Sequence, residues 1–172
     1  MTGADRERLF VELYDQNRAR LLRLCAGYLG SAADADELFQ DVMINVWNGL
    51  PAFRRESSAS TWIYRIAVNT ALMYRRAASR RAKVITTPVD ALPDRAAPPE
   101  DGDNERRLAQ LHRAIAWLAP QDRICITLTL EGLSYKEIAE VTGMTVNHVG
   151  VRMSRAKRAL ESSMKEHDGG TL

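Results

Sequence analysis

Prolines gather in one stretch of this 172-residue chain, and that stretch limits the folds open to it. Four of the six lie within a dozen residues: Pro88, Pro93, Pro98 and Pro99. Acidic residues surround them, and almost nothing there could join an apolar core. Because such a composition favours extended, solvated backbone, we expect a flexible acidic linker over 84–104. The chain then consists of two small helical domains, an N-terminal unit at 1–83 and a C-terminal unit at 105–172.

Apolar residues in both units recur at helical spacing, and no segment shows the alternation of a strand. We therefore predict an all-α protein. The N-terminal pattern predicts a helix or helix pair over 9–28, a second helix over 31–49 capped by Ser31, and a third capped by Ser60 or Thr61. The apolar face expected for this third helix consists of Trp62, Ile63, Ile66, Thr70 and Met73.

The C-terminal unit ends in a helix-turn-helix pattern. Two predicted helices occupy 108–132, and Ser134 then begins a capping box for a short helix. Gly143 provides a backbone able to adopt positive φ at the turn. The last helix begins at Thr145 or Asn147. This order places the second helix of the pair where a major groove could receive it.

The last helix carries a local positive charge. Between Thr145 and Arg158 four residues are basic and none is acidic, in a chain whose net charge is only +2. That small net charge excludes histone-like binding, so a nucleic-acid function must rest on such patches. An ordinary helical hairpin with a solvated basic face is the alternative. His148 has no Cys or His near it in the sequence, so we predict neither a metal site nor a cofactor.

Two charged segments stand out in the N-terminal unit. Acids cluster at the start of its second predicted helix: Asp34, Asp36, Glu37 and Asp41. The dipole of a helix N-terminus accounts for all of them except Asp41, so this helix could dock a basic partner. From 54 to 83 basic residues dominate and aromatic residues are interleaved, which suits single-stranded nucleic acid. The alternative is an amphipathic helix with Trp62 and Tyr64 in its core.

Hydropathy and cysteine content indicate the cellular compartment. The longest apolar stretches are far shorter than a membrane span of about 20 residues, and no signal peptide heads the sequence. Cys25 and Cys125 are too few for a disulfide scaffold, and each fits a buried small apolar residue better than a redox sensor. We expect a cytoplasmic protein with reduced thiols.

Three stretches together resemble bacterial RNA polymerase sigma factors of the extracytoplasmic-function (ECF) group. Residues 34–47 resemble that group's core-binding helix, and 60–69 resemble the segment that opens and reads the minus-10 promoter element. Residues 132–157 resemble the reader of the minus-35 element. The stretches occur in the family's order and cover nearly all of the chain outside the linker. The resemblance implies a sigma-2-like domain and a sigma-4-like domain.

The resemblance also implies partners and site residues. The partners are core RNA polymerase, through the clamp helices of its largest subunit, promoter DNA (duplex at minus-35, single-stranded at minus-10) and an anti-sigma factor, with no membrane insertion. The implied core-binding residues are Asp36, Gln40, Asp41, Asn45 and Trp47. The implied minus-10 residues are Arg54, Arg55, Thr61, Trp62, Arg65 and Asn69. The implied minus-35 residues are Tyr135, Lys136, Asn147, His148, Arg152, Arg155 and Lys157.

The recognition helix departs from the commoner pattern of the family. Asn147, His148 and Gly150 stand where Gly, Thr and Lys are usual, so a promoter preference is not carried over. Two other functions fit parts of the sequence: a stand-alone helix-turn-helix regulator of duplex DNA, and a metal-dependent nuclease built on the acidic cluster. The charged N-terminal segments argue against the first. The lack of a histidine or second acidic cluster to complete a site argues against the second, so we expect no catalytic residue and no enzyme.

Overall fold

Helices make up nearly all of the part of the chain that the structure describes, residues 2–30, 32–54, 56–84 and 103–168, and no strand occurs there. The structure is a computed structural model. The all-α prediction is confirmed. The helices are α1 (Gly3–Leu29), α2 (Ala32–Gly49), α3 (Ala59–Val84), α4 (Asp103–Trp117), α5 (Pro120–Leu130), α6 (Tyr135–Thr142) and α7 (Val146–Asp168), with a 3-10 turn, η1 (Leu50–Ala52). The predicted Ser31 cap and most of the predicted linker lie outside the described residues.

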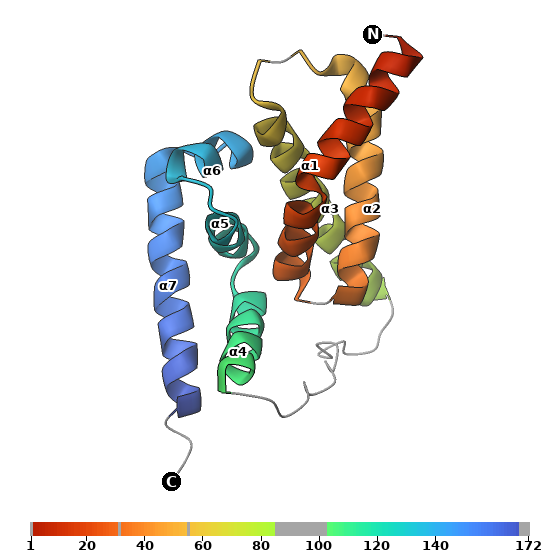
Figure 1. Ribbon diagram of the computed structural model, residues 1–172. Coiled ribbons are helices and arrows are strands. Elements are labelled where there is room, and N and C mark those ends of the chain that lie inside the picture. Colours follow the sequence, from red (N-terminus) through yellow and green to blue (C-terminus); the bar gives the residue numbers. More distant parts are fainter. Residues whose placement is uncertain (1, 31, 55, 85–102, 169–172) are drawn as a thin grey trace.

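The N-terminal unit consists of α1, α2 and α3, which pack side by side (Figure 1). The first helix is continuous and not a pair. Its one buried amide, Asn17, donates to the Leu13 carbonyl at 2.8 Å, so a polar residue is accommodated without a break. Periodic apolar residues fill the core between the helices: Leu21, Leu24, Leu38, Val42, Ile63 and Ala67. Met73 is an exception to the prediction, because 67% of it is exposed.

The C-terminal unit packs α4, α5 and α6 against the long helix α7 (Figure 1). Its core includes Ile124, Leu128, Ile138, Val149 and Met153. Gly143 ends α6 with φ 74°, the left-handed conformation expected of the turn residue. The predicted helix-turn-helix is therefore present, with α6 and α7 as its two helices.

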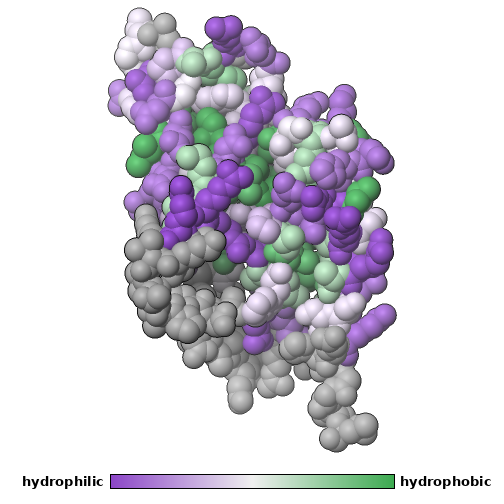
Figure 2. Space-filling model, turned by 180° about the vertical axis from the view of Figure 1, so that it is seen from behind, coloured by the Kyte–Doolittle hydropathy of each residue, from purple (hydrophilic) through white to green (hydrophobic). Residues whose placement is uncertain are grey.

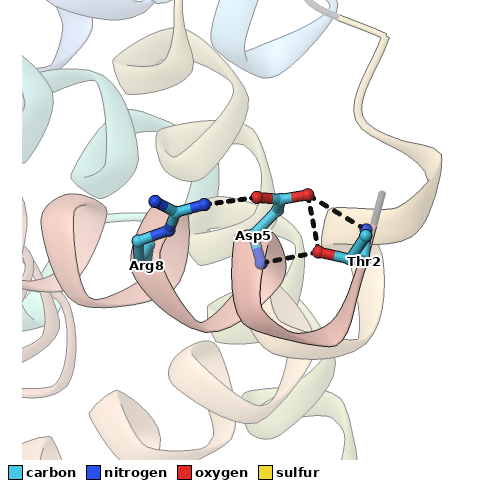
Figure 3. Close-up of polar contacts among 3 residues, drawn as sticks. All are labelled: Thr2, Asp5 and Arg8. Carbon is cyan, nitrogen blue, oxygen red and sulfur yellow. Dashed lines mark hydrogen bonds and ion pairs between the residues drawn. The ribbon is translucent and has the colours of Figure 1, made fainter.

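Hydrogen-bonded caps set several helix starts. A capping box that the sequence reading did not anticipate begins α1: Asp5 accepts from the Thr2 amide and hydroxyl and also pairs with Arg8 (Figure 3). The predicted box at Ser134 is confirmed. At α3 the cap is Ser58, whose hydroxyl accepts from the Thr61 amide at 3.0 Å. The prediction of Ser60 or Thr61 was wrong because Ser58 already satisfies that amide.

The two units also pack against each other, with α1 touching α4 and α5, and α3 touching α6. Both cysteines are buried, as the sequence predicted, and burial raises the pKa of Cys25 to about 12 and that of Cys125 to about 11. The face turned away in Figure 1 is mostly hydrophilic, with hydrophobic side chains in small separate spots (Figure 2). Among the described helices, none has the length and apolar character needed to cross a bilayer.

Candidate nucleic-acid and partner interfaces

The helix-turn-helix presents a shallow groove between the start of α6 and the outer face of α7. Tyr135, Asn147 and Arg155 of the sequence prediction line it together. Thr145 caps α7 by accepting from the His148 amide at 3.2 Å, so Asn147 remains free to extend from the first turn. The groove also contains Ser154 and Arg158. Arg158 belongs to the basic stretch that the sequence singled out, whereas Ser154 was not predicted; its position one turn after Gly150 is the signal that could have identified it.

Four of the predicted minus-35 residues do not line this groove. Lys136, His148 and Lys157 are exposed on the same two helices. Arg152 differs, since only 20% of its side chain is accessible and Nη1 lies 3.2 Å from Oδ1 of Asp122 in α5. This ion pair ties α7 to α5 and holds the Arg152 guanidinium at the edge of the unit's core.

A second polar face lies on α3. Thr61, Arg65 and Asn69 follow one another at intervals of four residues, so they share one side of the helix. Arg65 and Asn69 are exposed, and Arg65 Nη2 donates to the Glu140 carbonyl of α6 at 2.9 Å. Arg54 is exposed in the segment before the helix, whereas Arg55 lies outside the described residues.

The aromatic residues of α3 divide between two environments. Tyr64 is 3% exposed, so it belongs to the core. Trp62 is partly buried, and its ring lies 4.7 Å from that of Phe53 in the segment that leads into α3. The indole also packs against the end of α2, since a Cβ on Gly49 would lie 3.0 Å from Cζ2 of Trp62.

The predicted partner-binding residues of α2 form a continuous face. Asp36 and Gln40 are exposed, and Asp41 is partly exposed. Asn45 Nδ2 donates to the Thr70 hydroxyl of α3 at 3.0 Å, so this amide also fastens α2 to α3. Trp47 is partly buried: Phe10 packs edge-on at 5.3 Å, and the Arg6 guanidinium lies 4.0 Å from the ring centre.

A groove between α2 and α3 adjoins this face. Asp41 and Asn45 form one wall, and α3 contributes Met73, Tyr74 and Arg80 to the other. Ile44 and Met73 are 57% and 67% exposed, so the groove has apolar side chains at its surface. Tyr74 donates to Glu37 at 2.8 Å, and burial together with that carboxylate raises the pKa of Tyr74 to about 12. The α3 wall was missed because Met73 was assigned to the core.

Protein-family comparisons match both units of the chain. The model of Sigma-70 region 2 matches residues 13–81, and that of Sigma-70 region 4 matches residues 108–160. The ECF RNA polymerase sigma-E factor of Escherichia coli is 32% identical over 171 residues, which cover 92% of this chain and 88% of that protein. The chain belongs to the sigma-70 family, in its ECF group. The RNA polymerase sigma-H factor of Pseudomonas aeruginosa is 30% identical over 169 residues, with the same coverage, 92% and 88%.

Two solved structures share the fold. The sigma factor RpoE of Bartonella quintana, determined in complex with the anti-sigma factor NepR, aligns with a TM-score of 0.71 at 21% identity, over 90% of this chain and 97% of that one. CnrH in complex with the cytosolic domain of CnrY gives a TM-score of 0.68 at 22% identity, over 96% and 91%. Sigma-70 region 2 therefore corresponds to α1–α3 and region 4 to α4–α7.

Proposed function

We propose that this chain is the promoter-specificity subunit of an RNA polymerase, with α1–α3 holding the core enzyme and the minus-10 element and α4–α7 reading the minus-35 element. The observation that carries the proposal is that region 2 and region 4 both match, while each unit keeps a polar helix face exposed. Catalysis belongs to the polymerase, and the chain acts in the cytoplasm, where promoter DNA is. The chain itself supplies recognition.

The α2 face is the proposed polymerase-docking surface. Asp36, Gln40 and Asp41 offer acidic and amide groups to a basic helix of the largest subunit, and the apolar residues Ile44 and Met73 lie beside them. Electrostatic complementarity of this kind guides association and selects the partner. Asn45 and Trp47 contribute by holding the shape of the face, since both bond or pack within the unit.

The α3 face and the helix-turn-helix are the proposed DNA-binding surfaces. Arg54, Arg65 and Asn69 would contact the backbone and edges of a separated strand, and Trp62 would stack on an unpaired base. Asn147 enters the major groove at the N-terminus of α7, flanked by Tyr135 and Arg155. Two weak readers held on one polymerase gain affinity through effective concentration.

Control by an anti-sigma factor completes the proposal. One similar structure is a complex with the anti-sigma factor NepR, and another is a complex with the cytosolic domain of CnrY. A regulator of this kind would cover the α2 face and the groove beside it, because those are the surfaces that the polymerase needs.

The binding of core polymerase tests the proposal. The purified chain should bind core enzyme with high affinity, and Asp41→Ala should weaken that affinity about tenfold through loss of one interface charge. Asp15→Ala is the matched control, since Asp15 is an exposed acid on α1 and should leave the affinity unchanged. A chain that binds duplex DNA alone and never binds core enzyme would instead be a stand-alone helix-turn-helix regulator.

A further inference from the structure

Gly150 lies inside the long helix α7 at a position where the fold gives no reason for a glycine. Its backbone is ordinary helix, in contrast to the positive φ of Gly143 at the turn. A Cβ added at Gly150 would meet no group outside its own helix backbone within 4 Å, whereas one at Gly49 would lie 3.0 Å from the Trp62 ring. Glycine is less favourable than alanine inside a helix because it loses more backbone freedom on folding. The sequence therefore weakens α7 where packing would accept a side chain.

Gly150 forms part of the floor of the groove between α6 and α7. Asn147 stands three residues before it and Ser154 four residues after it, so the three share one side of the helix. Tyr135 of α6 and Val151 of α7 line the groove with them. The missing side chain leaves bare backbone between these neighbours. A group that enters the groove can therefore approach the helix more closely at Gly150 than at the positions beside it.

This floor offers packing contact and no hydrogen bond. Inside a helix the N–H of Gly150 is bonded to the carbonyl four residues earlier, and its carbonyl accepts from the amide four residues later. Val151 is 43% exposed and adds methyl groups to the same surface. A polar group placed there would lose its bonds to water without replacing them, whereas an apolar group gains contact. The ligand group that fits the floor is therefore apolar.

The rim of the groove is positively charged. Arg155 and Arg158 line it, and none of the described residues that line it is acidic. Arg152 adds no charge to the rim, because its guanidinium pairs with Asp122 of α5 at 3.2 Å. A cationic rim around an apolar floor suits the major groove of DNA, where phosphates flank the exposed edges of the bases.

Thymine carries the group that matches such a floor. Among the four unmodified bases it alone presents an apolar group in the major groove, its C5-methyl. A methyl carbon packs against another carbon at about 3.5–4.0 Å. Since a C–C bond is about 1.5 Å long, the bare Cα of Gly150 lets this methyl lie about that much closer to the helix than an alanine would.

We propose that Gly150 and Val151 form a thymine seat, a surface that receives the C5-methyl of one thymine in the minus-35 element. The proposal rests on the proposed function, and it names a base although the family pattern gives no promoter preference for this chain. The methyl lies against the Gly150 backbone and the Val151 side chain, while Arg155 and Arg158 hold flanking phosphates. Gly150 thus determines specificity through the side chain that it lacks.

Replacement of single thymines by deoxyuridine tests the thymine seat, because deoxyuridine forms the same base pair and lacks only the C5-methyl. The holoenzyme of core polymerase and the full chain is bound to a promoter that it selects from a genomic library. Each minus-35 thymine, on either strand, is then replaced in turn. At one position the replacement should weaken binding about fourfold, the effect of removing one buried methyl group.

Gly150→Ala tests whether that methyl lies on Gly150. The added Cβ takes the space of the methyl, so the variant should bind the thymine promoter several-fold more weakly than the wild type. It should lose no further affinity when deoxyuridine replaces the thymine. Its melting temperature should rise by about 3 °C, because alanine favours the helix. Gly3→Ala is the matched control, since Gly3 is exposed on α1 and its Cβ would also lie in open space. It should keep the fourfold effect.

Two further comparisons isolate the methyl contact. Val151→Thr keeps the shape of the side chain and replaces one methyl by a hydroxyl, so it should reduce the fourfold effect towards one. 5-Methylcytosine carries the same C5-methyl on a different base pair. In a C·G variant of the position, it should bind the wild type about fourfold more tightly than cytosine does, and it should bring Gly150→Ala no such gain.

The outcomes separate the thymine seat from the proposed function. If no thymine replacement weakens wild-type binding, or if Gly150→Ala keeps the full deoxyuridine effect, the thymine seat is wrong and the proposed function stands. If the wild-type chain neither binds core polymerase nor selects a promoter, the proposed function is refuted and the thymine seat with it.

Discussion

The proposed recognition helix α7 and the proposed docking helix α2 differ in how their predicted functional residues are held. On α7 Asn147 and Arg155 are exposed, whereas Arg152, which was also predicted to read DNA, ties the helix to its unit through Asp122. On α2 two of the five predicted docking residues are also structural: Asn45 bonds to α3, and Trp47 packs against Arg6 and Phe10. We therefore expect DNA reading and folding stability to depend on different residues of α7. Polymerase docking and folding stability should depend in part on the same residues of α2.

The largest effect is expected for Trp47→Ala, which tests whether polymerase docking and folding stability depend on the same residue of α2. Removing a partly buried indole that packs on Phe10 and under Arg6 should cost about 3 kcal/mol of unfolding free energy. Core-polymerase affinity should fall with it, as measured by denaturant titration and a binding assay on one preparation. Asn147→Ala is the counterpart on α7 and should leave unfolding unchanged. If Trp47→Ala lost affinity at full stability, the coupling claimed for α2 would be wrong.

Arg152→Ala and Arg155→Ala should separate stability from DNA binding within one helix. Loss of Arg152 leaves Asp122 without its ion pair and should cost about 2 kcal/mol, with little change in the salt dependence of promoter binding. Arg155→Ala should leave the melting temperature unchanged and reduce the slope of log K against log salt by about one. Thermal melts and salt titrations of promoter binding would measure the two effects. A reduced salt slope for Arg152→Ala, with an unchanged melting temperature, would place Arg152 on the DNA.

The substitution Ser58→Ala tests which residue caps the N-terminus of α3. The Ser58 hydroxyl accepts from the Thr61 amide, so its loss should cost about 1 kcal/mol. Ser60→Ala removes an exposed hydroxyl two residues further on and should change the unfolding free energy by much less. Equal effects in urea unfolding would mean that the helix begins where the sequence alone suggested.

The two cysteines should behave alike, although they lie in different units. Both thiols have a raised pKa through burial, so neither is ionised at pH 8 and neither should react with a thiol reagent until the protein unfolds. Because the folded-state pKa values exceed the ordinary 9.0, this contribution to stability is complete below about pH 9 and declines as pH rises toward 11 to 12. Fast labelling of Cys125 alone would reveal a looser C-terminal core.

Sequence reasoning recovered what local chemistry determines. Helical periodicity, the Ser134 capping box and Gly143 are decided within a few residues, and all are present in the fold. The Met73 error arose because periodicity cannot tell which edge of an apolar stripe faces a neighbouring helix. The same is true of Arg152, whose partner Asp122 is thirty residues away. Contacts between the units have no sequence signature because they join residues far apart in the chain; Arg23 and Glu131, for example, are 108 positions apart.

Promoter-dependent transcription tests the central proposal most directly. Core polymerase, the purified chain and a genomic fragment library from its host should yield run-off transcripts that begin at discrete sites and that core enzyme alone does not make. Asn147→Ala should reduce those transcripts while core binding persists, because the minus-35 reader is impaired and the docking face is intact. An active core enzyme that gives no additional transcript with the chain, after any bound inhibitor has been removed, would contradict the account.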